Sequence, residues 1–279
     1  MAGPKNMLET KNIDQEAESI EAIETSLYDS LKKQDHDQSL VIEEGVRLTQ
    51  TGINVLDRTL GGGLPTGSLT YFSADPRSMS EVFLYQFTQS RTTYYFTTSR
   101  RPRYVLNDVI NLGFDPGNIV FVDIYSEYYC TSCGDMSDNV GNEFIDSKII
   151  EFTEYNLRNI ANDSSGEEVN IIFDSFSFFM ELTVNKGLIR QLINVLYETT
   201  KELGCLTYLY GIKNGNGHDV ENFVYGLCDV IFESMLDKGA DKIDSKLAIP
   251  KIRGMIPSTE IIKFKIGDGV QIDTSKDIA

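Results

Sequence analysis

The chain has 279 residues, a formal net charge of −17 at pH 7 and four cysteines. This length predicts one large domain with an appended segment, and a hydrophobic content of 41% is ordinary for a soluble protein with a substantial core. Such a negative charge disfavours a protein that binds nucleic acid by bulk electrostatics, because a phosphate backbone would be repelled.

The composition also indicates where the protein acts. No apolar run approaches the roughly 20 residues that span a bilayer, and residues 1–19 are too polar for a secretory signal. Four cysteines in a chain of this size do not suggest a disulfide scaffold. We therefore expect a cytoplasmic protein that has no membrane partner.

Residues 1–41 are expected to form a flexible acidic extension, rich in Glu, Asp, Gln and Ser. Apolar residues recur there at steps of three and four, as on one face of a helix: Ile13, Ala17, Ile20, Ile23, Leu27 and Leu31. Two interpretations are open. A marginal helix in a mobile tail is favoured because isolated helices are weak, and the alternative is a helix that docks on a partner or on the chain's own domain.

Residues 42–279 change to alternating apolar strands and amphipathic helices. In chain order, we expect a helix at 53–60, a strand at 68–72, a helix after a loop at 73–80, a strand at 93–98, a helix at 102–112, a strand at 118–123, a polar segment at 124–142, a helix at 145–160, a strand at 169–174, a helix at 186–203, a strand at 205–210, a helix at 219–228 and three strands within 230–272. Near-continuously apolar strands that alternate with helices predict a mostly parallel sheet covered on both faces. The last three strands are expected to add antiparallel pairing at one edge.

Four groups of short strings carry a resemblance to a known family. They are Thr51-Gly52-Ile53 with Leu56-Asp57, Leu60-Gly61-Gly62-Gly63, Pro65 and Gly67-Ser68; Ile171-Ile172-Phe173-Asp174-Ser175; Cys228-Asp229-Val230-Ile231; and Lys251-Ile252-Arg253-Gly254 followed by Phe264-Lys265-Ile266 and Gly269. In this order they resemble the RecA-like ATPases, specifically the archaeal branch similar to the clock ATPase KaiC. The resemblance covers about residues 42 to 275. It implies an α/β, RecA-like P-loop NTPase fold, with antiparallel strands at the C-terminal edge.

The loop that binds phosphate in that family has changed. Working loops read G-x-x-x-x-G-K-[ST], because backbone amides must converge on the phosphates and a lysine must offset their charge. The matching positions are Ser73-Ala74-Asp75-Pro76-Arg77-Ser78-Met79-Ser80. No glycine remains, Pro76 has no N–H to donate, and Met79 replaces the lysine. Only Ser80, which matches the family's Mg²⁺ ligand, is retained.

The catalytic residues implied by the resemblance are also missing. Ser99 and Arg100 occupy the positions of the family's catalytic glutamate pair. Asp174 matches the acidic residue that ends the second conserved strand, and it is equally well interpreted as an ordinary capping residue or as a vestigial Mg²⁺ ligand. We therefore expect no catalytic residue and at most a vestigial nucleotide site, formed by Ser73, Pro76, Arg77, Ser78, Met79, Ser80 and Asp174.

Two pairs of residues near other motifs have ordinary explanations that we favour. Lys251 and Arg253 match residues that, in ring-forming relatives, reach the nucleotide of the neighbouring subunit, but charges on the polar face of a strand need no such role.

Cys130 and Cys133 form a single C-x-x-C in a polar loop. Zinc needs four ligands in a structural site, and the chain has no second pair, so we expect no metal site. A site shared across a dimer, or one completed by Asp135, is the weaker alternative.

Arg100, Arg101 and Arg103 form the densest positive cluster of the sequence. They follow the carboxyl end of a predicted strand, which is the edge where open α/β sheets bind ligands. A solvated loop is the simpler interpretation. The alternative is an anion site, or a docking site for the acidic extension.

The leading functional hypothesis is a non-catalytic KaiC-like protein, a pseudo-ATPase that acts in regulation or assembly through protein contacts, with no cofactor. Its partners are expected to be proteins, further copies of itself included. The alternative is a divergent ATPase that binds ATP and Mg²⁺ and has a signalling or DNA-repair role. A nucleic-acid module that uses Arg100 to Arg103 is the weakest of the three.

We predict that the N-terminal extension is dispensable for folding, because it lies outside the alternating core pattern. Deletion of residues 1–38 is expected to leave a soluble protein whose thermal unfolding is as cooperative as that of the full chain. Calorimetry of the two forms checks this. Aggregation, or a large fall in melting temperature, would show that the helical stripe packs on the domain.

Overall fold

The computed structural model describes residues 46–138, 140–213, 218–238, 243–256, 260–267 and 269–273. The predicted N-terminal extension and its helical stripe lie outside the described residues. The chain divides into the units Met1–Gly45 and Val46–Ala279, and the fold below is that of the second unit.

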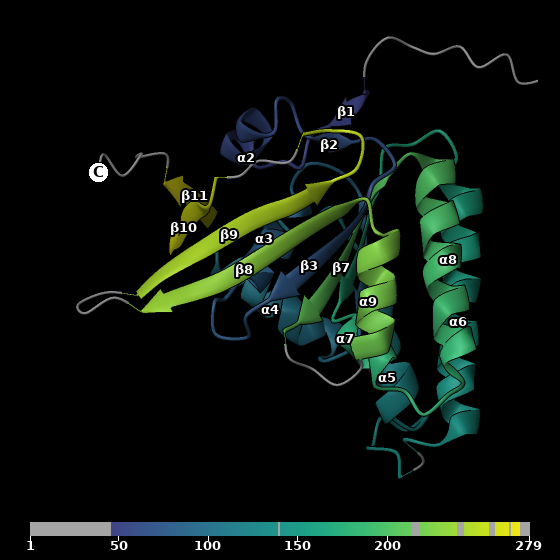
Figure 1. The fold of residues 1–279 in the computed structure, drawn as a ribbon. Helices are drawn as coiled ribbons and strands as arrows, with labels where there is room; N and C mark the ends of the chain where they lie inside the picture. Colours follow the sequence, from purple (N-terminus) through teal and green to yellow (C-terminus); the bar gives the residue numbers. More distant parts are fainter. Residues whose placement is uncertain are drawn as a thin grey trace, which may run out of the picture. The chain divides into compact units, whose positions relative to one another are not determined.

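A nine-stranded sheet forms the centre of this unit (Figure 1). Its strands, in spatial order, are β11 (Gly269–Asp273), β10 (Ile262–Gly267), β9 (Ile243–Ile252), β8 (Val230–Lys238), β3 (Leu69–Ala74), β7 (Leu206–Ile212), β6 (Asn170–Asp174), β4 (Thr93–Thr97) and β5 (Ile119–Asp123). The six strands from β8 to β5 are parallel, and β9, β10 and β11 continue the sheet in antiparallel pairs. A separate antiparallel pair joins β1 (Leu48–Thr49) to β2 (Leu64–Pro65).

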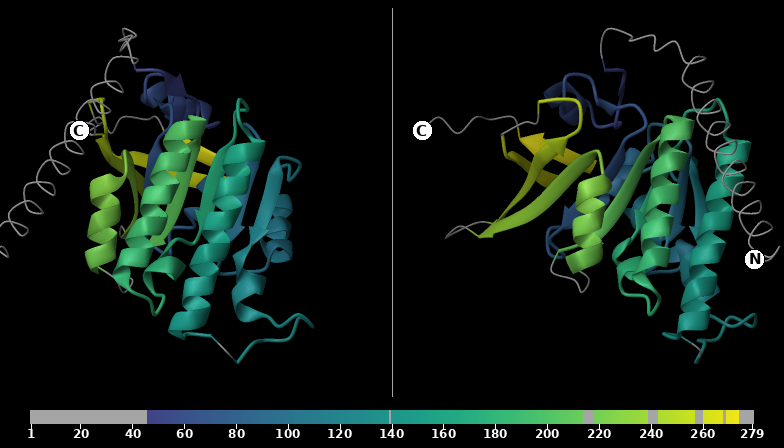
Figure 2. Two further views of the ribbon diagram at one scale, coloured as in Figure 1. Left: turned by 90° about the vertical axis from the view of Figure 1, so that its right-hand side faces the viewer. Right: turned by 45° about the vertical axis from the view of Figure 1, so that its right-hand side comes forward.

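Helices cover both faces of the sheet. One face packs against α2 (Asn54–Thr59), α3 (Glu81–Phe87) and α4 (Pro102–Asn111). The other packs against α5 (Ile124–Tyr129), α6 (Glu143–Asp163), α7 (Ser177–Met180), α8 (Lys186–Leu203) and α9 (His218–Leu227). Figure 2 shows α6, α8 and α9 side by side over that face.

The strands are buried on both sides because their apolar residues face two separate cores. In β3, Phe72 and Ala74 belong to the core beneath α3, whereas Leu69 and Tyr71 belong to the core beneath α8. This explains why the strands read as continuous apolar runs rather than as alternating patterns. The predicted α/β class, the mostly parallel sheet and the antiparallel C-terminal edge are confirmed.

The C-terminal segment differs from the prediction in strand number. Residues 230–273 form four strands rather than three, because β10 and β11 pair as a tight hairpin with Gly267 opposite Gly269. Because the turn is so short, the sequence has almost no polar segment between the two strands, and they were predicted as one. The first of the four, β8, is parallel to β3 and extends the parallel part of the sheet.

Two short helices were also missed. The segment 124–142, expected to be polar and irregular, begins with α5, whose first turn is capped by the Asp123 carboxylate accepting from the Ser126 amide at 2.9 Å. Helix α7 is a four-residue turn after β6. Neither is long enough to give a readable period in the sequence, and both are held by packing against the core.

The first group of strings in the resemblance, which includes Asp57 and Gly63, stabilises the local fold. The Asp57 carboxylate accepts hydrogen bonds from the Thr51 amide and hydroxyl, both at 2.8 Å, and from the Gly52 amide at 3.3 Å. At Gly63, where φ is +135°, an added Cβ would lie 2.2 Å from the Thr49 carbonyl oxygen. A side chain at this position would therefore prevent β1 from approaching β2.

Asp229 joins four elements at the edge where the parallel strands begin. Its carboxylate is buried and accepts from the Leu69 amide at 3.0 Å and from Lys201 Nζ at 2.6 Å, and it lies 3.4 Å from Arg253 Nε. Lys201 also donates to the Gly67 carbonyl at 2.7 Å. The start of β3, the end of α8, the start of β8 and the end of β9 are thus tied to one carboxylate.

We predict that Asp229→Asn lowers the free energy of unfolding by about 2 kcal/mol, because it removes a buried charge from two cations and a backbone amide. Asp237→Asn is the matched control. Asp237 pairs with Lys246 at 2.6 Å, but its side chain is 58% exposed, so its loss is expected to leave stability nearly unchanged. Urea unfolding of both variants measures the difference, and equal effects would contradict the role assigned to Asp229.

Candidate functional site

A cleft of about 690 Å³ lies at the carboxyl ends of the parallel strands. Strands β4, β6 and β7 supply its floor, and α3, α5 and α7 supply its walls. Its lining residues are Pro76, Glu81, Thr98, Ser99, Arg100, Tyr125, Tyr129, Met136, Asp174, Ser175, Ser177, Phe178, Glu181, Tyr210 and Ile212. Open α/β sheets bind their ligands at this edge, so the cleft is the candidate functional site.

The loop between β3 and α3 is closed by its own side chains. The Asp75 carboxylate accepts from the backbone amide of Arg77 at 3.0 Å and from two nitrogens of its guanidinium, at 3.0 and 2.9 Å. The Ser78 amide donates to the Asp75 carbonyl at 2.9 Å, which completes a tight turn. The charge of Arg77 is therefore already paired, and the amides of Arg77 and Ser78 are already used inside the loop.

A cluster of hydroxyls lies beneath this loop. The Ser80 hydroxyl is within hydrogen-bonding distance of Ser78 Oγ at 3.0 Å, Ser234 Oγ at 3.1 Å and the Tyr210 hydroxyl at 3.2 Å. Ser80 has no exposed surface. Its oxygen faces other hydroxyls of the protein rather than the cleft, so a metal ion could reach it only if the cluster were broken.

The seven residues of the predicted vestigial site are not gathered around one volume. Pro76 and Asp174 line the cleft. Ser73 receives a hydrogen bond from the Tyr225 hydroxyl at 3.2 Å, on the opposite face of the sheet from Ser80. Met79 takes a φ of +53° and its residue is 51% exposed. The loop therefore has a non-glycine residue in the left-handed conformation, which is uncommon, and it presents no cation at this position.

Asp174 lies at the floor of the cleft and is only 8% exposed. Its Oδ2 accepts from the Tyr95 hydroxyl at 2.9 Å and lies 3.8 Å from Arg100 Nη2. Burial raises the pKa of Asp174 above its ordinary value, and the charge of Arg100 and the bond from Tyr95 oppose that rise. Asp174 is thus part of a buried network, and the N-terminal capping position of α7 after it is Phe176, which makes no side-chain cap.

The three arginines expected as an anion site point to three different sets of partners. Arg100 contacts the Asp108 carboxylate and donates to the Tyr85 hydroxyl at 2.8 Å. Arg101 donates to Cys130 Sγ at 3.1 Å and to the Gly134 carbonyl at 3.0 Å. Arg103 donates to the neighbouring Tyr104 hydroxyl at 2.8 Å, and its guanidinium lies 4.7 Å from the centroid of that ring. The structure does not bring the three guanidiniums to one point.

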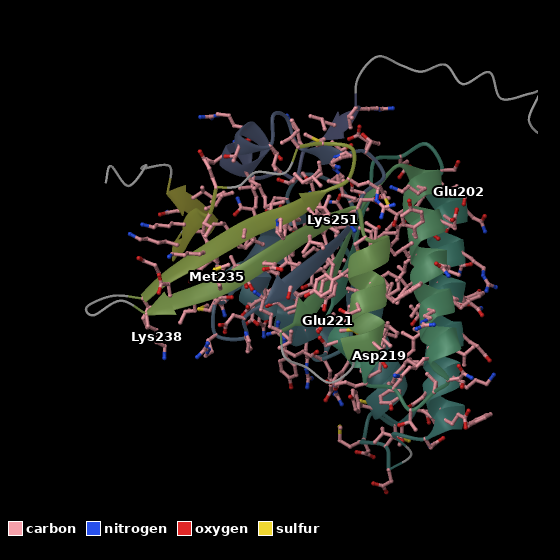
Figure 3. All side chains as sticks on the ribbon, viewed as in Figure 1. Glu202, Asp219, Glu221, Met235, Lys238 and Lys251 are labelled. Carbon is pink, nitrogen blue, oxygen red and sulfur yellow. The ribbon has the colours of Figure 1, made fainter. Side chains whose placement is uncertain are left out.

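Lys251 and Arg253 contact the end of α9 (Figure 3 labels Lys251). Lys251 Nζ donates to the Tyr225 carbonyl at 2.7 Å, and Arg253 Nη2 donates to the carbonyls of Gly226 and Leu227 at 3.0 Å. The last carbonyls of a helix lack intrahelical partners and carry partial negative charge. These two cations therefore cap α9 on the chain that carries them.

Cys130 and Cys133 lie in a turn beside the cleft. Both thiols are free, and Cys130 forms an isolated antiparallel bridge with Met136, which itself lines the cleft. Within the described residues no group of three or more His, Cys, Asp or Glu side chains could hold a metal ion.

Sequence reasoning missed several residues that form the walls of the cleft. Glu81 and Glu181 supply carboxylates, and Tyr125, Tyr129 and Phe178 supply aromatic rings. The tyrosines of the segment 124–129 were visible as a cluster, but their role depends on α5, which was not predicted. The two glutamates follow β3 and β6, and the parallel pairing of these strands through β7 is what places both at one edge.

A family model described as a family of unknown function, DUF7125, matches residues 48–279. The chain belongs to this family. A comparison with curated proteins gives no match.

Among solved structures, the chain is similar to a KaiC-like protein from the hyperthermophilic archaeon Pyrococcus horikoshii OT3. The TM-score is 0.63 at 20% sequence identity, and the match covers 82% of this chain and 100% of the other. This family member therefore has the RecA-like fold of KaiC-like proteins. Over the residues that the structure describes, no helix is both long enough and apolar enough to span a bilayer.

We predict that the pairing inside the loop controls the titration of Asp75. The bonds from Arg77 lower the pKa of Asp75 from its ordinary value of 3.8 to about 2. Because the folded-state pKa is depressed, the stabilisation is complete above the unfolded pKa and is lost as pH falls from 3.8 towards 2. In Arg77→Ala the pKa is expected to return towards 3.8.

Carbon-detected NMR of the carboxyl group over this pH range measures the shift. Arg158→Ala is the control, because Arg158 pairs with Glu154 on α6 and does not touch the loop. If Asp75 of the unmodified protein titrated at its ordinary pKa, the closed loop would not exist in solution.

Proposed function

We propose that this protein is a non-catalytic, KaiC-like member of the RecA-fold proteins, which acts in the cytoplasm in regulation or assembly through contacts with other proteins. The observation that carries the proposal is the closed loop after β3. Its one cation is paired with Asp75, and the Ser80 hydroxyl is buried among other hydroxyls.

The loop lacks the means to hold phosphates. Phosphate binding at this position relies on amides that converge on the anion, on a positive charge and on the start of a helix. Here Pro76 has no amide hydrogen, the amide of Ser78 is bonded to Asp75, and Met79 carries no charge. An anion would have to break the turn before it met the Ser78 amide or the Arg77 guanidinium.

The cleft beside the loop is also unsuited to phosphate transfer. Phosphoryl transfer depends on cations that neutralise charge around the phosphates. Arg100, the one cationic side chain among the described lining residues, already contacts Asp108 and Tyr85. Ser99 has no carboxylate with which to orient water. These features support a protein without ATPase activity.

One observation favours the alternative, a divergent ATPase that binds ATP and Mg²⁺ and has a signalling or DNA-repair role. Asp174 and Arg100 still lie in a cleft of about 690 Å³ at the edge where related folds bind ligands. Binding of nucleic acid is disfavoured by the net charge of −17 and by the separate partners of the three arginines.

The positions that reach a neighbour's nucleotide in ring-forming relatives support the same proposal. Lys251 and Arg253 are engaged with the end of α9, so they are not free to act across a subunit boundary. If the chain forms homo-oligomers, we infer that nucleotide does not bridge them.

We predict that the protein shows no saturable binding of Mg-ATP or Mg-ADP in the micromolar range. A dissociation constant of 1 μM requires about 8 kcal/mol, and the absent lysine and amide contacts supply much of that in a working site. Met79→Lys alone is expected to rescue little, because the turn at Asp75 to Ser78 remains. Isothermal titration calorimetry of both proteins tests this.

The alternative gives a different result. Low-micromolar binding of Mg-ATP by the unmodified protein, or hydrolysis that is lost in Asp174→Asn, would overturn the proposed function. Arg77→Ala would then be the first variant to test for weaker binding, because Arg77 is the only cation on the loop.

A further inference from the structure

The candidate cleft carries an excess of negative charge. Its lining includes the carboxylates of Glu81, Asp174 and Glu181, and Arg100 is the only cationic side chain among the described lining residues. Three carboxylates against one guanidinium leave a formal charge of −2. Burial raises the pKa of Asp174, but a proton on this carboxyl would still leave the cleft negative. A phosphate-bearing ligand is repelled here and a cation is attracted.

Two of these carboxylates, those of Glu81 and Glu181, form no hydrogen bond or ion pair with any residue that the structure describes. Asp174 uses Oδ2 for Tyr95 and Arg100, and Oδ1 receives no hydrogen bond from a described residue. Asp174 lies at the floor of the cleft, and Oδ1 is not among the fully buried atoms that lack a partner, so this oxygen opens to the cleft and can accept a hydrogen bond from a ligand.

Aromatic rings form the wall beside these carboxylates. The rings of Tyr125 and Tyr129 have centroids 5.0 Å apart, and Tyr129 and Phe178 have centroids 6.2 Å apart. Glu181 lines the same cleft as Tyr129 and Phe178. Carboxylates beside ring faces are the surroundings in which proteins hold guanidinium and ammonium groups.

The arrangement is unsuited to a bare metal ion. The described carboxylates do not converge as a metal-binding group, since they come from α3, β6 and the end of α7. The cleft volume of about 690 Å³ lies in the range of sites for organic ligands. An extended organic cation can reach the separated carboxylates and cover the aromatic wall at the same time.

We propose that this cleft binds a guanidinium or ammonium group carried by a side chain of a partner protein. The inference rests on the proposed function, which assigns the protein to protein contacts. The position that relatives use for an anionic nucleotide thus serves a cationic ligand, and the acidic floor and aromatic wall supply the selectivity.

The test is a titration of the full chain with a blocked Gly-Arg-Gly tripeptide, followed by calorimetry and by NMR of the tyrosine rings. Saturable binding is expected, with shifts at Tyr125 and Tyr129. The same tripeptide with citrulline in place of arginine has nearly the same shape without the charge, and it is expected not to bind. Equal binding of both peptides, or no binding of the arginine peptide through millimolar concentrations, would overturn the proposal.

The double variant Glu81→Gln with Glu181→Gln is expected to weaken binding about tenfold, because each carboxylate near the surface contributes a few-fold to holding a unit cation. The matched control is Glu198→Gln with Glu202→Gln. It removes the same charge from exposed positions of α8, where Glu202 lies near the opposite edge of the sheet (Figure 3). An equal loss in both double variants would show only the effect of net charge and would overturn the assignment.

A separate arm distinguishes a partner's side chain from a free polyamine. Spermidine carries the same kind of cation without a peptide, and it is expected to bind no more than a few-fold tighter than the tripeptide at equal ionic strength. Binding that is a hundredfold tighter would overturn the protein source in favour of a small molecule.

Titration with Mg-ATP in the same samples separates the two proposals. Micromolar binding of Mg-ATP would overturn the proposed function. If the protein bound neither Mg-ATP nor the arginine peptide, the proposed function would stand and only the proposed cation site would be overturned.

Discussion

The parallel pairing of six strands is the constraint on which the rest of this structure depends. It sends every strand from β8 to β5 in one direction, so all the loops that follow them open at one edge. The opposite edge, where the strands begin, is held by the Asp229 carboxylate with Lys201 and Arg253. One edge is therefore tied by buried charge, and the other edge holds the cleft. The residues that stabilise the first edge are therefore different from the residues that line the cleft.

The loop after β3 stands at the position that holds phosphate in the family that the sequence resembles. Met79, which matches the lysine of working loops, takes a left-handed conformation with a φ of +53°. The polar groups of this loop form hydrogen bonds within the protein. The Asp75 carboxylate accepts from the Arg77 guanidinium, and the Ser80 hydroxyl lies within hydrogen-bonding distance of the hydroxyls of Ser78 and Tyr210. These polar groups are therefore bonded to one another within the protein.

The sequence predicted those features that depend on local pattern. Continuous apolar runs indicated the parallel strands, and Pro102 and Gly204 marked the ends of helices where the structure has them. It did not predict α5, whose six residues are helical because Asp123 caps them and the core buries Ile124. The walls of the cleft were missed for the same reason. Glu81, Tyr129 and Glu181 are distant in sequence, and only the sheet topology brings their elements together.

Lys251 and Arg253 also have partners within the fold. In the resemblance they match residues that act across a subunit boundary, yet here their charges meet the carbonyls at the end of α9. A cation is stabilised at a helix C-terminus whether or not a nucleotide is present. Retaining these two residues therefore carries no evidence of ATP binding, since the fold alone gives them a role. The same reasoning applies to Asp174, which Tyr95 and Arg100 hold in place. In this chain these motif residues have partners within the fold, so their presence alone is no guide to a ligand.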